Sequence, residues 1–144
     1  MRFEVICTAM TAINSHVVVP IAPELRFDAV RSMAHFMGQH LMKAHPKDIT
    51  MDWSVPRRTG KVFLDYNMNV RGKSMIAPYS PRGLAGAPVS MPLTWSELEQ
   101  TQPMDFRITT AATLLAKHGD RWRDLPSTSQ DLQAILSANK ASSR

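Results

Sequence analysis

The stretch GKVFLDYNMNVRGKSMIAPYSPR, residues 60–82, shows the clearest structural pattern in this sequence. It holds two strand-like runs, KVFLDYNMN and KSMIAPY, with only the tripeptide VRG between them. Two β-prone runs with so short a connection predict a β-hairpin. Side chains alternate along a strand, so we expect Phe63, Asp65 and Asn67 to share one face. The pattern places a lone carboxylate, Asp65, in a strand, where it either costs burial energy or holds a positive group.

Two interpretations of Asp65 are open. Basic residues flank it in the sequence: Arg58, Lys61, Arg71, Lys73 and Arg82. In the first interpretation, Asp65 pairs with Arg71 or Lys73 and tethers the sheet. In the second, Asp65 binds a hard divalent cation, and the basic groups hold the phosphates that the cation bridges. Composition alone favours the tether.

Short strands and one long helix are expected before this stretch. EVICTA, residues 4–9, and HVVVPI, residues 16–21, have the composition of strands. The second run is nearly continuous in β-branched residues, which predicts a buried strand. Apolar side chains recur at helical spacing from about Phe27 to Ala44. We therefore expect an amphipathic helix there, which ends before Pro46.

The second half of the sequence predicts a loop followed by helices. SPRGLAGAPVSMP, residues 80–92, has the proline and glycine content of a loop. Thr94 with Glu97 three residues later predicts a capping box at a helix start. Residues 109–117 and 129–137 are amphipathic at helical spacing and predict two further helices.

Length and composition are those of an ordinary globular protein. Of the 144 residues, 44% are hydrophobic and 20% are charged. We expect one α+β domain over residues 1–125, then a C-terminal helix and a frayed tail over residues 126–144. No apolar run approaches the roughly 20 residues that cross a bilayer, so we expect no membrane partner. Cys7 is the only cysteine, which excludes an internal disulfide and favours a reducing, cytoplasmic location.

Several common sites lack their motifs here. The histidines form no recognised zinc spacing, and the sequence has no P-loop, no G-x-G-x-x-G and no G-x-S-x-G. The formal net charge of +5 favours a polyanion partner if the charge gathers on one face. The acid of the predicted hairpin and the basic residues around it therefore remain the candidate site.

Three segments resemble, in order, the second half of the polymerase domain of bacterial ligase D: HVVVPIAP, FDAVRSMAHFMGQHLMKAHPKDIT and GKVFLDYNMNVRGKSMIAPYSPRGLAGAPVSMPLTWSEL. The resemblance runs from about His16 to Asp124. It implies a partial primase-polymerase-like fold, α+β, with a small mixed or antiparallel sheet, a hairpin and flanking helices. It also implies template-dependent nucleotidyl transfer at DNA ends, in bacterial non-homologous end joining.

The resemblance implies roles for the residues that match the family's pattern. Asp65 corresponds to a catalytic carboxylate that binds a divalent metal, Mn or Mg. His16 and Arg82 correspond to contacts with the nucleoside triphosphate. Arg58 and Ser74 also fall where the family contacts nucleotide. The candidates for contact with DNA or phosphate are Asn69, Arg71 and Lys73.

Two parts of the family's site are missing from this sequence. The resemblance places a metal-binding D-x-D pair upstream of the first residue, and no D-x-D occurs in the 144 residues. The family's glycine- and serine-rich loop is replaced by TAMTAINS, residues 8–15, with Ala9 or Met10 where the serine would fall. Two-metal phosphoryl transfer needs several carboxylates to hold its cations. We therefore expect an incomplete metal site and an isolated chain that is inactive.

Three classes of function are compatible with these observations. In the first, the chain is a fragment of a ligase D-type polymerase and works with a separate segment that supplies D-x-D. In the second, it is a degenerate relative that binds DNA ends or nucleotides without catalysis. In the third, it is a relic fold with no role on nucleic acid. Salt-sensitive DNA binding without nucleotide incorporation would favour the second class.

Overall fold

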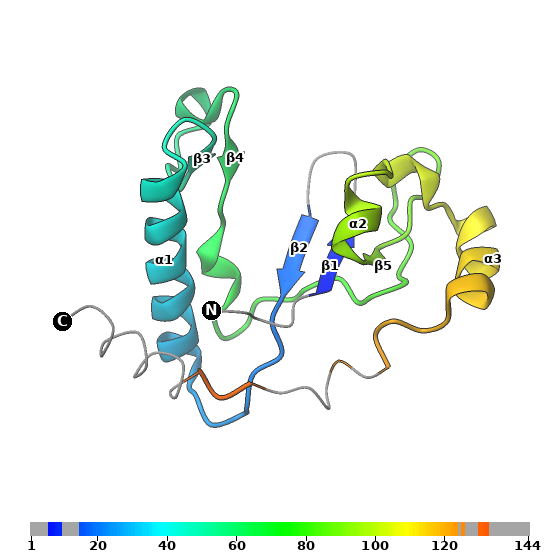
Figure 1. The fold of residues 1–144 in the computed structure, drawn as a ribbon, viewed down its shortest axis with the longest axis horizontal. Coiled ribbons are helices and arrows are strands. Elements are labelled where there is room, and N and C mark those ends of the chain that lie inside the picture. Colours follow the sequence, from blue (N-terminus) through cyan, green and yellow to red (C-terminus); the bar gives the residue numbers. More distant parts are fainter. Residues whose placement is uncertain (1–5, 10–14, 124, 126–129, 133–144) are drawn as a thin grey trace. The chain divides into compact units, whose positions relative to one another are not determined.

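The computed structural model describes residues 6–9, 15–123, 125 and 130–132 (Figure 1). The described chain is α+β, as the sequence predicts, and it divides into two compact units. The first comprises Met1–Pro23 and Ile76–Arg144, and the second comprises Glu24–Met75. Most of the predicted helix at 129–137 and of the tail lies outside the described residues, so the boundary at residue 125 stays a prediction.

The first unit contains a three-stranded antiparallel sheet with the order β2-β1-β5. Its strands are β1 (Ile6–Ala9), β2 (Ser15–Val18) and β5 (Met91–Leu93) (Figure 1). Both strands expected near the start of the chain are confirmed. The expected burial of the second is wrong, because β2 lies at the sheet edge and Val17 is 57% exposed. An edge strand with one face toward water alternates between exposed and half-buried side chains, as β2 does.

The core of the first unit lies in and beside the segment that the sequence predicts as a loop, residues 80–92. Val89, Met91 and Leu93 are buried, and Met91 and Leu93 form a cluster with Phe106. The backbone N–H of Val89 donates to the carbonyl of Phe106 at 2.8 Å. A proline inside a strand is tolerated at a sheet edge, where its missing N–H is not needed, and β5 is an edge strand. The high proline content therefore concealed a core strand.

Two helices cover this region as the sequence predicts. Helix α2 (Trp95–Leu98) begins at Thr94 with the expected capping box. The backbone N–H of Thr94 donates to Glu97 Oε2 at 2.9 Å, and the backbone N–H of Glu97 donates to Thr94 Oγ1 at 3.4 Å. Helix α3 (Ile108–His118) confirms the amphipathic stretch, with Ala111 and Leu114 packed against the core cluster.

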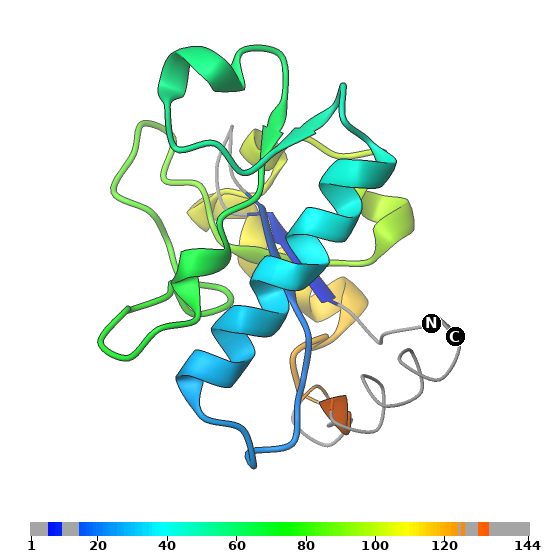
Figure 2. The same ribbon diagram turned by 90° about the vertical axis from the view of Figure 1, so that its left-hand side faces the viewer.

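The second unit is built on helix α1 (Phe27–Ala44), which has the predicted bounds and runs without a break (Figure 2). Strands β3 (Ile49–Thr50) and β4 (Val62–Phe63) pair in parallel, and the short 3-10 helix η1 (Val55–Arg58) lies between them in sequence. Gly38 is the buried residue of α1, and a Cβ built there would lie 2.8 Å from Met51 Sδ. The absent side chain at this position lets Met51 pack against the helix.

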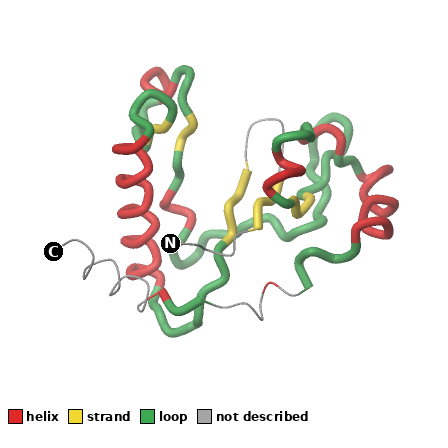
Figure 3. Tube along the Cα trace, viewed as in Figure 1, coloured by secondary structure: helices red, strands yellow, loops and turns green. Residues whose placement is uncertain are grey.

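The predicted hairpin over residues 61–79 is wrong. Strand β4 ends at Phe63, and a 3-10 helix, η2 (Tyr66–Met68), follows it directly. The run KSMIAPY is loop and turn rather than a strand (Figure 3). The cause lies in Asp65, whose Oδ1 accepts a hydrogen bond from the backbone N–H of Asn67 at 2.8 Å. Such a local bond begins a turn in place of a strand, so Phe63, Asp65 and Asn67 do not share a strand face.

The ion pair between Glu97 and Arg121 predicts a pH-dependent stability of the first unit. Burial raises the pKa of Glu97, but hydrogen bonds from Thr94 and Arg121 outweigh it and hold the pKa below its ordinary value. The ionised carboxylate therefore stabilises the fold above the pKa of an unfolded glutamate, about 4.3, and this contribution is lost as pH falls through the folded pKa.

We therefore expect the free energy of unfolding to fall less between pH 6 and pH 3 in Glu97→Gln than in the parent chain. Urea denaturation at a series of pH values measures this. Glu99→Gln serves as the control, because Glu99 is an exposed glutamate at the C-terminal end of the same helix. Parallel pH curves for the parent and Glu97→Gln would contradict the prediction.

Candidate nucleotide and metal site

Asp65 is an exposed carboxylate held in place by its own turn. It is the N-cap of η2, and its Oδ1 accepts from the backbone N–H of Asn67. The expected tether to Arg71 or Lys73 does not form: the ion pairs among the described residues are Arg57–Asp52 and Arg121–Glu97. One oxygen of Asp65 is thus fixed locally while the carboxylate stays open to solvent, which suits a single ligand to a hard cation.

A complete metal site is not assembled in the described part of the chain. Across residues 6–9, 15–123, 125 and 130–132, no three histidine, cysteine, aspartate or glutamate side chains gather as a metal would require. Mg²⁺ and Mn²⁺ favour about six oxygen ligands, many of which are carboxylates and waters. Asp65 therefore fits the role of one ligand, and the described residues do not supply the others.

Arg58 has a structural task that the sequence did not reveal. Its Nε donates to the carbonyl of Asp52 at 2.9 Å, and its Nη2 donates to the carbonyl of Trp53 at 2.6 Å. Its guanidinium carbon lies 3.7 Å from the centre of the Phe63 ring, which also contacts Trp53 edge to face. Arg58 thus fastens the turn before β4 to the strand itself. Any contact with a nucleotide has to use the donors that remain, chiefly Nη1.

The turn that Arg58 fastens also carries an ionised aspartate. The backbone N–H of Ser54 donates to Asp52 Oδ1 at 2.9 Å and lowers the pKa of Asp52, and Arg57 at 3.2 Å lowers it further. The Arg57 side chain is 74% exposed, so this ion pair lies at the surface and contributes little to stability.

The other predicted contacts of the second unit lie after η2. Asn69 is the C-cap of η2, and Arg71, Lys73 and Ser74 are exposed in the loop that follows. The loop turns at Gly72, where φ is +83°. These exposed cations form no ion pair with Asp65 and are available to a phosphate-bearing ligand.

The remaining two predicted residues belong to the first unit. His16 is half-buried on β2, opposite Thr8 of β1. Arg82 is half-buried, and its backbone N–H donates to the carbonyl of Pro88 at 2.8 Å. The structure therefore gathers Asp65 with the Asn69–Ser74 loop in one compact unit and places His16 and Arg82 in the other.

The support that Arg31 gives to the turn of Asp65 is not signalled by the sequence. Arg31 of α1 donates from Nε to Asn67 Oδ1 at 2.7 Å, and its guanidinium lies 5.5 Å from the centre of the Tyr66 ring. Arg31 thus fixes the side chain of Asn67, whose backbone N–H holds Asp65. The two partners are 36 positions apart in sequence, so no local pattern signals the contact.

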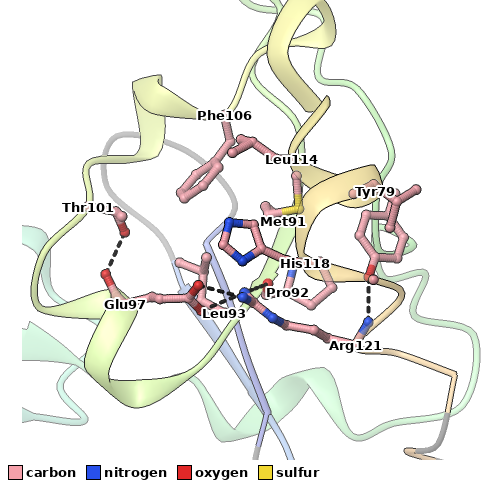
Figure 4. A pocket seen from close by; sticks show the side chains of 12 residues that line it. Tyr79, Met91, Pro92, Leu93, Glu97, Thr101, Phe106, Leu114, His118 and Arg121 are labelled. Carbon is pink, nitrogen blue, oxygen red and sulfur yellow. Dashed lines mark hydrogen bonds and ion pairs between the residues drawn. The ribbon is translucent and has the colours of Figure 1, made fainter. Parts of the chain in front are cut away.

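A small pocket of about 110 Å³ lies in the first unit beside the core cluster, lined by residues that include Met91, Phe106 and His118 (Figure 4). Tyr79, Glu97, Thr101 and Arg121, which line it, make hydrogen bonds within the unit. Arg121 donates to both carboxylate oxygens of Glu97, and its backbone N–H donates to the Tyr79 hydroxyl at 3.1 Å. Burial and a hydrogen bond to Asp120 raise the pKa of Tyr79. Most of the polar side chains of this pocket are therefore already satisfied within the unit.

Comparisons with known proteins show the family to which the chain is similar. The family described as "LigD, primase-polymerase domain" matches residues 14–122. The multifunctional non-homologous end joining protein LigD of Mycolicibacterium smegmatis is 34% identical over 105 residues, which are 73% of this chain and 14% of that protein. The corresponding protein of Pseudomonas aeruginosa is 32% identical over 124 residues, 84% of this chain and 15% of that protein. The chain thus spans about a seventh of the length of these relatives.

A solved structure is also similar. The polymerase domain of Mycobacterium tuberculosis ligase D, solved in complex with DNA, superposes with a TM-score of 0.77 at 26% sequence identity. The match covers 89% of this chain and 45% of that chain. The expected fold class is thereby confirmed. In the described part of the chain, no helix has the length and apolar content that a bilayer span requires.

Proposed function

The chain belongs to the LigD primase-polymerase family, and we propose that it supplies one part of a nucleotidyltransferase site that is incomplete without further carboxylates. The observation that carries the proposal is the geometry of Asp65. Its carboxylate is exposed, is fixed by the backbone N–H of Asn67 at 2.8 Å, and has no ion pair among the described residues. Such a group is available to a divalent cation.

In this proposal, different residues of the chain bind the metal, the nucleotide and the DNA end. Asp65 contributes one ligand to Mn²⁺ or Mg²⁺, which when bound neutralises charge on the phosphates. His16 and Arg82 contact the triphosphate. Ser74 and the free donors of Arg58 contact the nucleotide. The exposed residues Asn69, Arg71 and Lys73 contact phosphates of a DNA end.

The proposal includes a partner, because the sequence contains no D-x-D pair. A separate segment that carries this pair would supply the carboxylates that Asp65 lacks, and the resulting site would act on DNA ends in end joining. The resemblance to bacterial repair proteins supports this setting and a cytoplasmic location. By itself, the chain contributes one carboxylate, Asp65, to a site that needs several for two-metal chemistry, so we propose that it is inactive alone.

A metal titration tests this proposal. We expect the isolated chain to bind Mn²⁺ weakly, with a dissociation constant of about 10⁻⁴–10⁻³ M, because one carboxylate plus water compensates little of the cation's charge. Asp65→Asn should weaken this binding further. The relaxation rate of water protons during a manganese titration reports both values.

Asp48→Asn is the matched control, since Asp48 is another exposed aspartate of the second unit. It should bind Mn²⁺ as the parent chain does. Micromolar affinity that survives Asp65→Asn would place the metal site elsewhere and refute the proposal.

A second candidate function is a non-catalytic module that binds DNA ends or nucleotides. The exposed cations of the loop after η2 favour it, because they suit the phosphate backbone without a metal. Binding of this kind is electrostatic and largely independent of sequence.

We expect the triple variant Arg71→Gln, Lys73→Gln and Arg82→Gln to reduce the slope of log affinity against log salt by about 3, since each phosphate contact contributes roughly 0.9 on duplex DNA. Fluorescence anisotropy with a labelled duplex end measures the slope.

Arg58 is left intact because its guanidinium holds the turn before β4. A control triple variant at the exposed residues Arg26, Lys43 and Arg57 removes the same charge. The hypothesis of a non-catalytic DNA-binding module is excluded if both triple variants show the same slope of log affinity against log salt as the parent chain.

A further inference from the structure

A polar hollow lies on the surface of the second unit between helix α1 and the 3-10 helix η2. Its lining residues are Arg31, Ser32 and His35 of α1 and Tyr66 of η2, and its volume is about 290 Å³. Arg31 and Ser32 are exposed, while His35 and Tyr66 are half-buried. None of these residues is assigned a contact with metal, nucleotide or DNA in the function proposed above, although Arg31 supports Asn67 and through it Asp65.

Every side chain that lines the hollow is able to donate a hydrogen bond, and no carboxylate is among them. The Nε of Arg31 donates a hydrogen bond to Asn67 Oδ1 at 2.7 Å, so its two Nη groups remain free to donate to a ligand. Ser32 and Tyr66 carry hydroxyls, and the imidazole of His35 carries one N–H when neutral and two when charged. A ligand with several acceptor oxygens and negative charge matches this lining.

The spacing on the helix supports the same conclusion. Arg31 and His35 are four positions apart, so their side chains lie on one face of α1. Two basic groups on one helix face repel each other when both are charged, unless an anion lies between them. The acid that could neutralise them on the same helix is Asp28, one turn before Arg31, but it does not line the hollow and forms no ion pair with Arg31 among the described residues.

The lining is also held in a fixed arrangement. The ring centres of His35 and Tyr66 are 4.6 Å apart, and the guanidinium carbon of Arg31 lies 5.5 Å from the Tyr66 ring centre. The bond from Arg31 to Asn67 limits the rotation of the guanidinium. A donor set that is ordered without its ligand loses less conformational entropy on binding.

We propose that Arg31, Ser32, His35 and Tyr66 form a binding site for a phosphate ester. Arg31 donates from its Nη groups to the phosphate oxygens, Ser32 and His35 donate from the same helix, and Tyr66 forms the wall. The phosphate belongs either to a nucleoside triphosphate or to the backbone of a nucleic-acid strand. The proposal does not depend on Asp65 binding a metal.

Two probes in low salt test the site and distinguish the sources: ATP without divalent cation, and a fluorescently labelled single-stranded 12-nucleotide DNA. We expect Arg31→Gln to weaken binding of at least one probe about tenfold, the effect of losing a charge-assisted hydrogen bond. A loss confined to ATP assigns the site to the triphosphate, and a loss with the oligonucleotide assigns it to a strand.

Arg57→Gln is the control, because it removes the same charge from the same unit at a side chain that is 74% exposed. The double variant Ser32→Ala and His35→Gln leaves the bond between Arg31 and Asn67 in place, and it should show the same loss even if Arg31→Gln disturbs η2. The site is refuted if Arg31→Gln and the double variant both bind both probes within about twofold of Arg57→Gln. The manganese titration of Asp65→Asn tests the metal site independently of these probes. The proposed phosphate site and the proposed metal site can therefore be refuted separately.

Discussion

Mixing the chain with a separately expressed segment of a LigD polymerase domain that carries D-x-D should produce template-dependent primer extension, and Asp65→Ala should remove it. The added segment supplies the D-x-D pair, which does not occur in the 144 residues. Asp65 then completes the ligand set from its exposed position at the start of η2. Two cations held in register are needed to bring the primer's 3′-oxygen near its nucleophilic form and to neutralise the leaving pyrophosphate.

The expected loss in Asp65→Ala is about 10²-fold or more in rate, comparable to the removal of one preorganised electrostatic group from an active site. Gel-resolved primer extension with Mn²⁺ and ribonucleotides measures it. Asp48→Ala should retain the restored activity, because Asp48 is exposed and has no role in the proposed site. Restored activity that Asp65→Ala leaves intact would show that Asp65 is not a ligand of the catalytic metals.

Phe106→Ala should cost about 3–5 kcal/mol of unfolding free energy, the range for truncation of a buried aromatic side chain. Phe106 is 6% exposed and forms the buried cluster of the first unit with Met91 and Leu93. Its carbonyl also accepts from the backbone N–H of Val89, so a shift of this residue also disturbs the segment that leads into β5. A cluster this small has few neighbours that could collapse into the cavity.

Urea denaturation followed by circular dichroism measures this loss. Ile108→Ala is the control, because Ile108 is 59% exposed at the start of α3 and its truncation should change stability by about 0.5 kcal/mol or less. A loss below about 1 kcal/mol in Phe106→Ala would show that the core of the first unit lies elsewhere.

Sequence patterns correctly predicted the secondary structure that residues close together in the chain determine. Helix α1 has its predicted bounds because apolar residues recur along one face and Pro46 follows closely. The capping box at Thr94 was predictable because both of its hydrogen bonds lie within three residues. These elements need no knowledge of the rest of the chain.

The predictions from sequence were wrong where distant contacts or competing local hydrogen bonds determine the secondary structure. Strand β5 was hidden by the prolines around it, and Pro92 within it is tolerated because the strand lies at a sheet edge. The hairpin failed because Asp65 bonds its own turn, and this local bond prevailed over the β propensity of the flanking residues.

The candidate site shows the same division. Asp65 was predictable as a chemical group, but its support by Asn67 and Arg31 depends on a contact between residues 36 positions apart. The part that Arg58 plays in fastening its turn was equally hidden, because it depends on backbone carbonyls and on the Phe63 ring. Sequence thus indicates which groups carry the chemistry, whereas their orientation follows from packing.

Primer extension by the purified 144-residue chain alone tests the central claim most directly. The assay contains a primed template, Mn²⁺ and ribonucleotides, which the family resemblance suggests as favourable conditions. The claim of an incomplete site predicts no product above the level of Asp65→Ala, because a single carboxylate does not hold two cations in register. Robust extension by the parent chain alone, abolished in Asp65→Ala, would contradict the claim and show that the chain carries a complete catalytic site.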